Sequence, residues 1–221
     1  MPGEPPVTRD RAEALARVPL PPDMIERLEV YEHLLRRWQR IDNLVAPASL
    51  DHIWLRHFAD SAQILDLMPQ ALRWVDLGSG AGFPGLVVAI LLSGRPGAEV
   101  HLIESNRRKC AFLRDVSRET SSAGIIHSGR AETIAPTLTG IEVVTARALA
   151  PLAKLIAYAD PLLKKGASGL FLKGQNVSNE LTELPPLDNF NVTLAASKTD
   201  PSGRIVVITP TDMPISDGRS R

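Results

Sequence analysis

The stretch DLGSGAGFPG, residues 76–85, combines one carboxylate with four glycines and one proline in ten positions. It directly follows Trp74 and Val75, an apolar pair typical of a buried strand. A glycine-rich turn between a strand and a helix lets the backbone approach a nucleoside cofactor closely. The turn is therefore predicted to bind such a cofactor, and a glycine turn without a ligand is the less favoured interpretation.

Two cofactor motifs overlap in this turn. Residues 80–85 match G-x-G-x-x-G, a dinucleotide fingerprint that is weak evidence alone, and place Pro84 at the helix entry. Residues 76–82 match D-x-G-x-G-x-G, the first motif of S-adenosylmethionine-dependent methyltransferases, and this match begins where the strand ends. Glu104 closes the next predicted strand, where its carboxylate can accept hydrogen bonds from the ribose of either cofactor. S-adenosylmethionine is favoured over NAD.

The residues after the fourth predicted strand limit the acceptor chemistry. Methylation of an exocyclic amine usually employs an Asn/Asp-Pro-Pro-aromatic turn, but residues 143–151 read VVTARALAP. Methylation of cytosine C5 needs a thiolate, and Cys110, the one cysteine, is predicted to be a core residue of a helix. An acceptor that already carries a lone pair, such as a ring nitrogen, remains. Its methylation needs no general base, because orientation can supply about 7–11 kcal/mol of the barrier.

Strands and helices alternate after Pro69, which indicates a parallel sheet covered on both faces. Strands are expected at residues 73–77, 98–104, 124–128, 142–146 and 168–173, and helices at 84–93, 106–121 and 150–164, with a short turn at 131–135. Two further strand-like runs flank residues 200–203, whose Asp-Pro-Ser-Gly sequence favours a type I turn. The predicted fold is an α/β sheet whose last strand is reversed, as in methyltransferases and unlike the all-parallel dinucleotide sheet.

The first seventy residues are predicted to be mainly helical. Apolar residues recur at spacings of three and four between Pro22 and Arg40, which indicates a helix with one apolar face. Residues 47–65 indicate a second helix with Ser49 as its N-cap, and residues 1–8 a frayed end. We expect three parts: a helical extension over residues 1–70, a methyltransferase domain over 71–210 and a tail over 211–221.

Composition limits the class of protein. The 221 residues carry 25 basic and 25 acidic side chains, so a protein that coats nucleic acid through bulk charge is not expected. A local basic cluster nevertheless exists, formed by Arg107, Arg108, Lys109, Arg114 and Arg118. A single cysteine, no secretory signal and no long apolar run predict a cytoplasmic protein outside the membrane. The scattered histidines predict no metal site.

The motifs resemble, in order, those of the bacterial 16S rRNA guanine-N7 methyltransferases, the ribosomal RNA small subunit methyltransferase G or glucose-inhibited division protein B family. The matching pieces are DLGSGAGFPGLVVAI, LIESNRRKCAFLRDV, GRAE, TARALAPL, LFLKGQ and GRIVVI, with NLVAP and RHFADSAQIL upstream. The resemblance runs over residues 25–209, and GSGAGFPG and ARALAPL are its more specific pieces. It implies a class I methyltransferase fold that methylates N7 of a guanosine in 16S rRNA.

The resemblance also implies roles for individual residues. It places Gly78, Ser79, Gly80, Phe83, Glu104, Ala131, Glu132 and Arg147 against S-adenosylmethionine, with Glu104 on the ribose and Ala131 and Glu132 beside the adenine. It places Arg147, Lys173 and Arg204 at the methyl-transfer site, where they hold RNA phosphate or the target base. Guanine O6 is the expected contact, since N7 must stay free. His57 and Asp60, about one helical turn apart, are interpreted as a local helix pair.

Two other function classes stay open. An NAD(P)-linked oxidoreductase is favoured only by the match at residues 80–85, and no Tyr/Lys or His/Asp hydride-transfer set is recognisable. A non-catalytic RNA-binding module of the same fold would be indicated by an eroded glycine loop or a lost Glu104, and neither is seen. The expected partner is 16S rRNA in the small ribosomal subunit or a precursor, and the expected state is a monomer.

Overall fold

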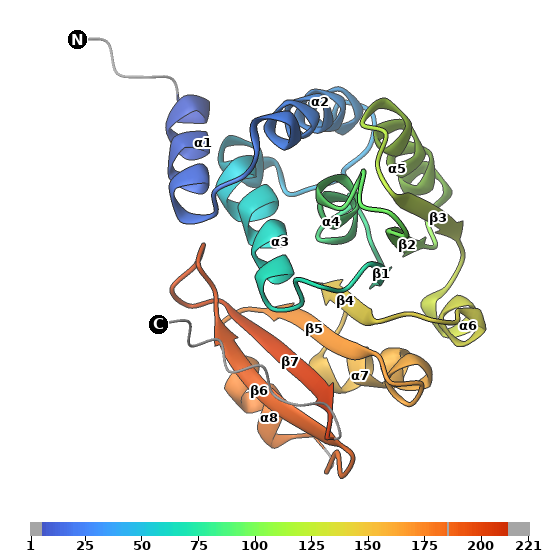
Figure 1. Ribbon diagram of the computed structural model, residues 1–221. Coiled ribbons are helices and arrows are strands. Elements are labelled where there is room, and N and C mark those ends of the chain that lie inside the picture. Colours follow the sequence, from blue (N-terminus) through green and yellow to red (C-terminus); the bar gives the residue numbers. More distant parts are fainter. Residues whose placement is uncertain (1–5, 185, 212–221) are drawn as a thin grey trace.

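A seven-stranded sheet forms the centre of the computed structural model, which describes residues 6–184 and 186–211 (Figure 1). The strands follow the order β3-β2-β1-β4-β5-β7-β6, and the first five in this order pair in parallel. Their bounds are β1 Arg73–Leu77, β2 Glu99–Glu104, β3 Gly124–Ser128, β4 Val143–Arg147 and β5 Ser168–Lys173. The predicted parallel strands are confirmed to within one residue at each end.

Helices cover both faces of this sheet, as parallel strands that are buried on both sides require. One face carries α4 Gly85–Leu91 and α5 Arg107–Glu119, with α2 Pro22–Gln39 packed on them; the other carries α6 Ala131–Ile134, α7 Leu152–Leu163 and α8 Val177–Thr182 (Figure 1). The sequence did not indicate α8. In the sheet, β1 lies between β2 and β4, so the strand order changes direction at β1. Open α/β sheets bind ligands at the carboxyl ends of the strands, at such a change in strand order.

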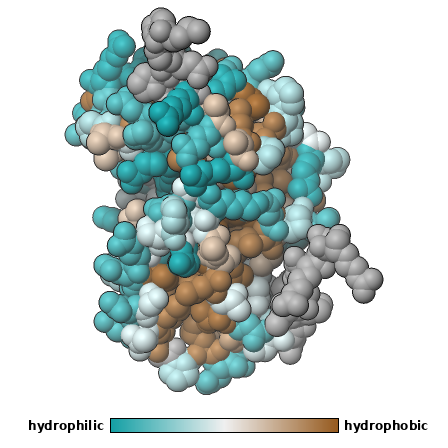
Figure 2. Space-filling view, turned by 90° about the vertical axis from the view of Figure 1, so that its left-hand side faces the viewer, coloured by the Kyte–Doolittle hydropathy of each residue, from teal (hydrophilic) through white to brown (hydrophobic). Residues whose placement is uncertain are grey.

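The last two strands form the predicted hairpin. β6 Phe190–Ala196 pairs antiparallel with β7 Arg204–Pro210, and β7 also pairs antiparallel with β5. The reversed strand is therefore confirmed, and it lies inside the sheet, between β5 and β6. Figure 2 shows the side of the molecule at the left of Figure 1, where hydrophobic residues gather in the lower half, at the height of this hairpin.

The N-terminal segment begins with a helix that the sequence did not indicate. α1 Pro6–Arg17 includes three residues of the predicted frayed end, so that prediction is wrong for residues 6–8, while residues 1–5 lie outside the described residues. A run of good helix formers, DRAEALAR, explains the helix, and its Ala14 is buried in the core. The helix predicted between Pro22 and Arg40 is confirmed as α2.

Residues 47–65 do not form one regular α-helix. They form a 3-10 helix Pro47–His52, a wide π turn Trp54–Ala59, one α turn α3 Asp60–Ala62 and a 3-10 turn Gln63–Asp66. Ser49 is not the N-cap, because the segment already begins at Pro47 and Ala46 takes the cap position. A proline is well suited to a first helical position, since it has no N–H to satisfy. The Ser49 hydroxyl instead donates to the Ala46 carbonyl at 2.7 Å.

The N-terminal segment and the sheet share one hydrophobic core, in which Tyr31 and Phe58 join Leu86 and Leu113. The division at residues 70 and 210 stays a prediction, and residues 212–221 of the predicted tail lie outside the described residues. Over the described part of the chain, no helix is long and apolar enough to cross a membrane. The same part contains no group of three or more side chains suited to a metal ion.

Candidate functional site

The glycine turn after β1 needs glycine for two different reasons. Gly78, Gly80 and Gly82 have φ values of +66°, +58° and +94°, in the left-handed region where side chains are strained. Space is the second reason, because a Cβ on Gly82 would lie 2.5 Å from the Tyr31 hydroxyl oxygen. That hydroxyl donates to the Ala81 carbonyl, so α2 supports the turn from behind. The turn therefore presents bare backbone on its outer side.

Asp76 supports this turn from below. Its carboxylate is fully buried and accepts hydrogen bonds from the Gly85 N–H at 3.2 Å and from the Thr145 hydroxyl at 3.0 Å. Burial raises the pKa of Asp76 to about 6, against hydrogen bonds that lower it. A Cβ on Gly85 would lie 2.5 Å from the Asp76 side chain, so this glycine is required by close approach. Asp76 links the turn to β4 and lines neither of the cavities described below.

Glu104 ends β2 and orients its carboxylate through two backbone donors. Oε2 accepts from the Gly80 N–H at 2.9 Å, and Oε1 accepts from the Asn106 N–H at 2.7 Å. The carboxylate lines a cavity of about 100 Å³. The other predicted cofactor contacts in the lining are Gly78, Ala131 and Glu132. A fixed carboxylate beside bare glycine backbone fits a nucleoside, because it can accept both ribose hydroxyls.

Four predicted cofactor contacts do not line this small cavity: Ser79, Gly80, Phe83 and Arg147. Gly80 touches it only through the hydrogen bond from its N–H to Glu104, and Arg147 lines the other cavity described below. Ser79 is buried, and its hydroxyl donates to the Asp76 carbonyl at 3.1 Å. Phe83 is also buried, stacked against Tyr31 at a centroid distance of 5.3 Å and against His57 at 4.7 Å. Both side chains hold the turn against the rest of the protein, and their contact with a cofactor stays a prediction.

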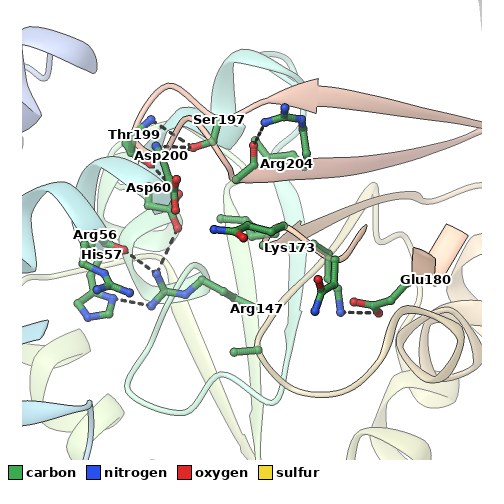
Figure 3. Close-up of a pocket in the computed structure, with 17 residues that line it drawn as sticks. Arg56, His57, Asp60, Arg147, Lys173, Glu180, Ser197, Thr199, Asp200 and Arg204 are labelled. Atoms are coloured by element: carbon green, nitrogen blue, oxygen red, sulfur yellow. Dashed lines mark hydrogen bonds and ion pairs between the residues drawn. The ribbon is translucent and has the colours of Figure 1, made fainter. Parts of the chain in front are cut away.

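A second, larger cavity of about 670 Å³ lies at the carboxyl ends of β4 and β5 and the start of β7 (Figure 3). Arg147 ends β4, Lys173 ends β5, and Arg204 begins β7 directly opposite Lys173 in the sheet register. The structure thus brings the three predicted methyl-transfer residues into the lining of one cavity. Their spacing along the chain gives no sign of this proximity, which results from the strand order.

Arg147 is held by contacts with several other residues. Its Nη1 donates to the Arg56 carbonyl at 2.9 Å and pairs with Asp60 Oδ2 at 3.3 Å, and its Nη2 contacts His57 Nδ1 at 2.8 Å (Figure 3). The guanidinium carbon lies 5.0 Å from the centre of the Phe83 ring, in cation–π contact. Burial lowers the pKa of Arg147, and the Asp60 carboxylate acts in the opposite direction. An arginine keeps its charge at physiological pH, and these contacts fix the position of the guanidinium.

The other two cations have partners of their own. Lys173 Nζ pairs with Glu180 at 2.7 Å and donates to the Ala150 carbonyl at 3.2 Å. Arg204 Nη1 donates to the carbonyls of Pro201 and Gly203 at 2.8 and 2.7 Å, within the hairpin turn. The cavity is thus lined by cations whose charges are partly balanced locally.

His57 and Asp60 were not expected at this site. The interpretation as a local helix pair is wrong, because both side chains contact Arg147, which comes from the end of β4. Asp60 also accepts from the Thr199 hydroxyl at 2.8 Å, which joins it to the β6–β7 turn. The one signal in the sequence was the presence of polar residues, RH and D, in an otherwise apolar run.

The segment after β4 separates the two cavities. Ala148 lines the larger cavity with a φ of +54°, and Leu149 lines the smaller one, with its side chain over Gly78. A methyl donor in the smaller cavity and an acceptor in the larger one would meet at this segment. Cys110 lies elsewhere, buried in α5 with its thiol directed at the Glu104 carbonyl, so its predicted core position is confirmed.

Comparison with known proteins gives a consistent result. A family model described as rRNA small subunit methyltransferase G matches residues 24–196. The protein of that name from Bradyrhizobium sp. (strain BTAi1) is 50% identical over 203 residues, which cover 91% of each chain. One from Methylorubrum extorquens is 49% identical over 182 residues, or 82% of this chain and 86% of the relative.

Solved structures resemble the fold at low sequence identity. A methyltransferase from Geobacter sulfurreducens has a TM-score of 0.57 at 15% identity, covering 84% of this chain and 89% of its own. The O-methyltransferase TomG from Streptomyces achromogenes, solved with S-adenosylmethionine, has a TM-score of 0.56 at 18% identity, covering 84% and 90%. The fold is that of S-adenosylmethionine-dependent methyltransferases, and an oxidoreductase is not favoured.

Proposed function

The chain belongs to the rRNA small subunit methyltransferase G family, and from this premise we propose that it methylates N7 of a guanosine in 16S ribosomal RNA. S-adenosylmethionine is the cofactor, and it supplies an electrophilic methyl group on a sulfonium. The observation that carries the proposal is the pair of adjoining cavities at the carboxyl edge of the sheet, separated by residues 147–149.

The smaller cavity has the features that the nucleoside part of the cofactor needs. The Glu104 carboxylate is held by the Gly80 and Asn106 amides and would accept the ribose hydroxyls. Ala131 and Glu132 line the same cavity and would flank the adenine. The bare backbone of the glycine turn would take the methionine moiety. These groups bind and orient, and none of them transfers a proton.

The larger cavity has the size and charge to take a purine base. Arg147, Lys173 and Arg204 would direct donors at guanine O6 or at adjacent phosphates and leave N7 in line with the methyl group. N7 attacks through its own lone pair, so orientation replaces a base. The product, 7-methylguanine, is cationic, and the ion pairs of Arg147 with Asp60 and of Lys173 with Glu180 reduce the repulsion it meets.

The basic helix α5 supports an RNA substrate. Four of its basic side chains make no ion pair and no hydrogen bond within the described residues, namely those of Arg107, Arg108, Lys109 and Arg114. Arg118, by contrast, pairs with Asp115 and Glu119. Cations without acidic partners, on a helix that starts beside Glu104, would contact phosphates around the target nucleotide. The zero net charge of the chain favours, as the substrate, an assembled subunit or its precursor over naked RNA. We propose that the enzyme acts as a monomer in the cytoplasm.

A methyl-transfer assay with radiolabelled S-adenosylmethionine tests the function. The substrate is 30S subunits from cells that lack the gene, and the product is mapped by cleavage at 7-methylguanine. We expect one labelled guanosine with the unaltered enzyme and none with Arg147→Ala, while the affinity for S-adenosylmethionine stays within about twofold. Labelling at another atom, or none despite cofactor binding, would refute the proposal.

A salt titration tests the RNA contact of α5. Each lost phosphate contact reduces the slope of log affinity against log salt by about 0.7–0.9. We expect this reduction for Arg107→Ala and for Arg108→Ala. Arg118→Ala is the matched control on the same helix, and its slope should equal that of the unaltered protein because Arg118 is already paired. Equal slopes for all variants would show that α5 does not contact the RNA phosphates.

A further inference from the structure

A chain of hydrogen bonds runs from the larger cavity into the N-terminal segment. It begins at the Arg147 guanidinium, passes through the His57 ring and the Ser49 hydroxyl, and ends at the Ala46 carbonyl. We propose that His57 is a positioning residue for methyl transfer, which holds Arg147 through a neutral imidazole. The inference rests on the proposed function, because it assigns a task to the arginine of that site.

The donor and acceptor at each link follow from the chemistry of its ends. A guanidinium has only donors, so His57 Nδ1, 2.8 Å from Arg147 Nη2, must accept. The hydrogen of the neutral ring is then on Nε2, which donates to Ser49 Oγ at 3.0 Å. The Ser49 hydroxyl in turn donates a hydrogen bond to the Ala46 carbonyl at 2.7 Å. The chain is therefore satisfied at every link by one tautomer of His57.

The surroundings of His57 favour the uncharged ring. Its ring stacks on Phe83 at 4.7 Å, which removes water from one face. Burial, together with the charges of Arg147 and Arg56, lowers the pKa of His57 to about 3. A proton on Nδ1 would place two cations in contact and would break the link to Arg147. The imidazole thus acts as an acceptor, not as an acid or base.

The π turn Trp54–Ala59 and the residue that follows it, Asp60, together supply three groups to one arginine. Figure 3 shows Arg56, His57 and Asp60 grouped around the Arg147 guanidinium. The Arg56 carbonyl and the Asp60 carboxylate accept hydrogen bonds from Nη1, and the His57 ring accepts one from Nη2. With Phe83 under the guanidinium carbon, both the position and the plane of the group are fixed. π turns inside helices frequently occur at functional sites.

Loss of His57 would free Nη2 and let the guanidinium tilt within the cavity wall. A misplacement of about 1 Å can cost about 100-fold in rate, even when it arises away from the reacting atoms. The cofactor cavity would be unaffected, because His57 does not line it. The expected result of the change is thus a slower methyl transfer with unchanged cofactor affinity.

Substitution separates positioning from packing. We expect His57→Leu to lower the single-turnover rate on 30S subunits about 10- to 100-fold, with the calorimetric Kd for S-adenosylmethionine within about twofold of the unaltered enzyme. His57→Asn should restore the rate to within about threefold, since its Oδ1 can replace Nδ1 as acceptor. His127→Leu is the matched control, because that imidazole is also hydrogen-bonded, to His101, but far from Arg147. Its rate should not change.

An NMR measurement tests the same inference without any methyl transfer. The ¹⁵N shifts of the His57 ring in the full-length protein at pH 7 should be those of a neutral imidazole with its hydrogen on Nε2. A protonated ring, or one with its hydrogen on Nδ1, would overturn the inference even if His57→Leu fails to fold. An unchanged rate in His57→Leu would overturn it too. No methylation by the unaltered enzyme would refute the proposed function alone, and the NMR result would still decide the hydrogen-bond chain.

Discussion

The two cavities at the carboxyl edge of the sheet are built in different ways. The proposed cofactor side consists mainly of backbone: a glycine turn and one carboxylate, Glu104, fixed by two amides. The proposed acceptor side consists of charged side chains from β4, β5, β7, α8 and the N-terminal segment, and its two ion pairs, Arg147–Asp60 and Lys173–Glu180, each join different elements. One side depends on local conformation and the other on long-range contacts.

This difference indicates what each side can tolerate. A backbone site fails when a side chain is added, since a Cβ meets either a strained φ or a filled space. A side-chain site fails when a group is removed, since its neighbour loses a partner. The following variants are arranged to test that contrast, from the largest expected effect to the smallest.

Gly82→Ala should have the largest effect. A left-handed φ costs about 1–2 kcal/mol for a non-glycine residue, and the new Cβ would lie 2.5 Å from the Tyr31 hydroxyl and 2.8 Å from Leu86 Cβ. Overpacking adds about 1–3 kcal/mol. Urea unfolding and calorimetry with S-adenosylmethionine should show lost stability and lost binding together. The control is Gly80→Ala, with a φ of +58° but no atom closer than 3.8 Å, which should lose only about 1–2 kcal/mol. Equal losses would mean that space is not limiting.

Asp76→Asn should change how stability depends on pH. The folded-state pKa of about 6 lies above the ordinary value of 3.8, so the folded protein binds this proton more tightly than the unfolded chain. Stability from this group is complete below pH 3.8 and is lost as pH rises through 6, by up to about 3 kcal/mol. The asparagine variant lacks this loss.

Urea unfolding of both proteins at pH 4, 5, 6 and 7.5 measures the effect. The stability of the variant relative to the unaltered protein should rise with pH over this range. Asparagine can still accept from Gly85 and donate to Thr145, which keeps the link between the two sides of the cleft. If the difference in stability between the two proteins stays constant over this pH range, burial does not raise the pKa of Asp76.

Lys173→Met should affect the acceptor side alone. The change removes a cation from the cavity and leaves Glu180 without its 2.7 Å partner. We expect methyl transfer to fall about 10- to 100-fold through poorer orientation, with unchanged affinity for S-adenosylmethionine. Lys164→Met removes an exposed lysine paired with Asp160 and should leave both quantities unchanged. Weaker cofactor binding in Lys173→Met would contradict the separation of the two sides.

Thr199→Val should have the smallest effect. It deletes the hydroxyl that donates to Asp60 at 2.8 Å but keeps the side-chain volume. One such hydrogen bond contributes about 0.5–1.5 kcal/mol to stability, and the rate of methyl transfer should fall only a fewfold. Thr182→Val removes a comparable local bond to the Asn179 carbonyl on exposed α8 and serves as the control. Identical behaviour of the two variants would show that the Asp60 contact is incidental.

The elements that build the proposed cofactor side could be predicted from sequence patterns because their determinants lie close together in the chain, while the cofactor contacts themselves stay a prediction. The turn at residues 76–85, the strand before it and Glu104 at the next strand end all occur within a few tens of residues. The hairpin was predictable for the same reason, since the Asp200–Gly203 turn is local and closes with a 3.0 Å hydrogen bond.

The acceptor side could be predicted only in part. Arg147, Lys173 and Arg204 were identified by resemblance, but their partners were not, because Asp60 and His57 reach Arg147 from a segment far along the chain. The irregular helix over residues 47–65 hid them as well. Its apolar residues indicate an ordinary helix, whereas Pro47 shifts its start and a π turn redirects its polar side chains. Such contacts depend on tertiary packing, which residue spacing does not encode.

The position of β1 between β2 and β4 has a consequence for how the protein folds and opens. Pairing β1 with β2 joins neighbouring units, but pairing β1 with β4 joins Trp74 to Val143 across the intervening β2–α5–β3 unit. Long-range pairings of this kind form late, because loop closure must precede them. The proposed functional cleft lies on this seam, between the turn after β1 and Arg147 at the end of β4. We therefore expect hydrogen exchange to find the cleft among the first regions to open, and a bound nucleoside or base to slow that opening by holding both halves together.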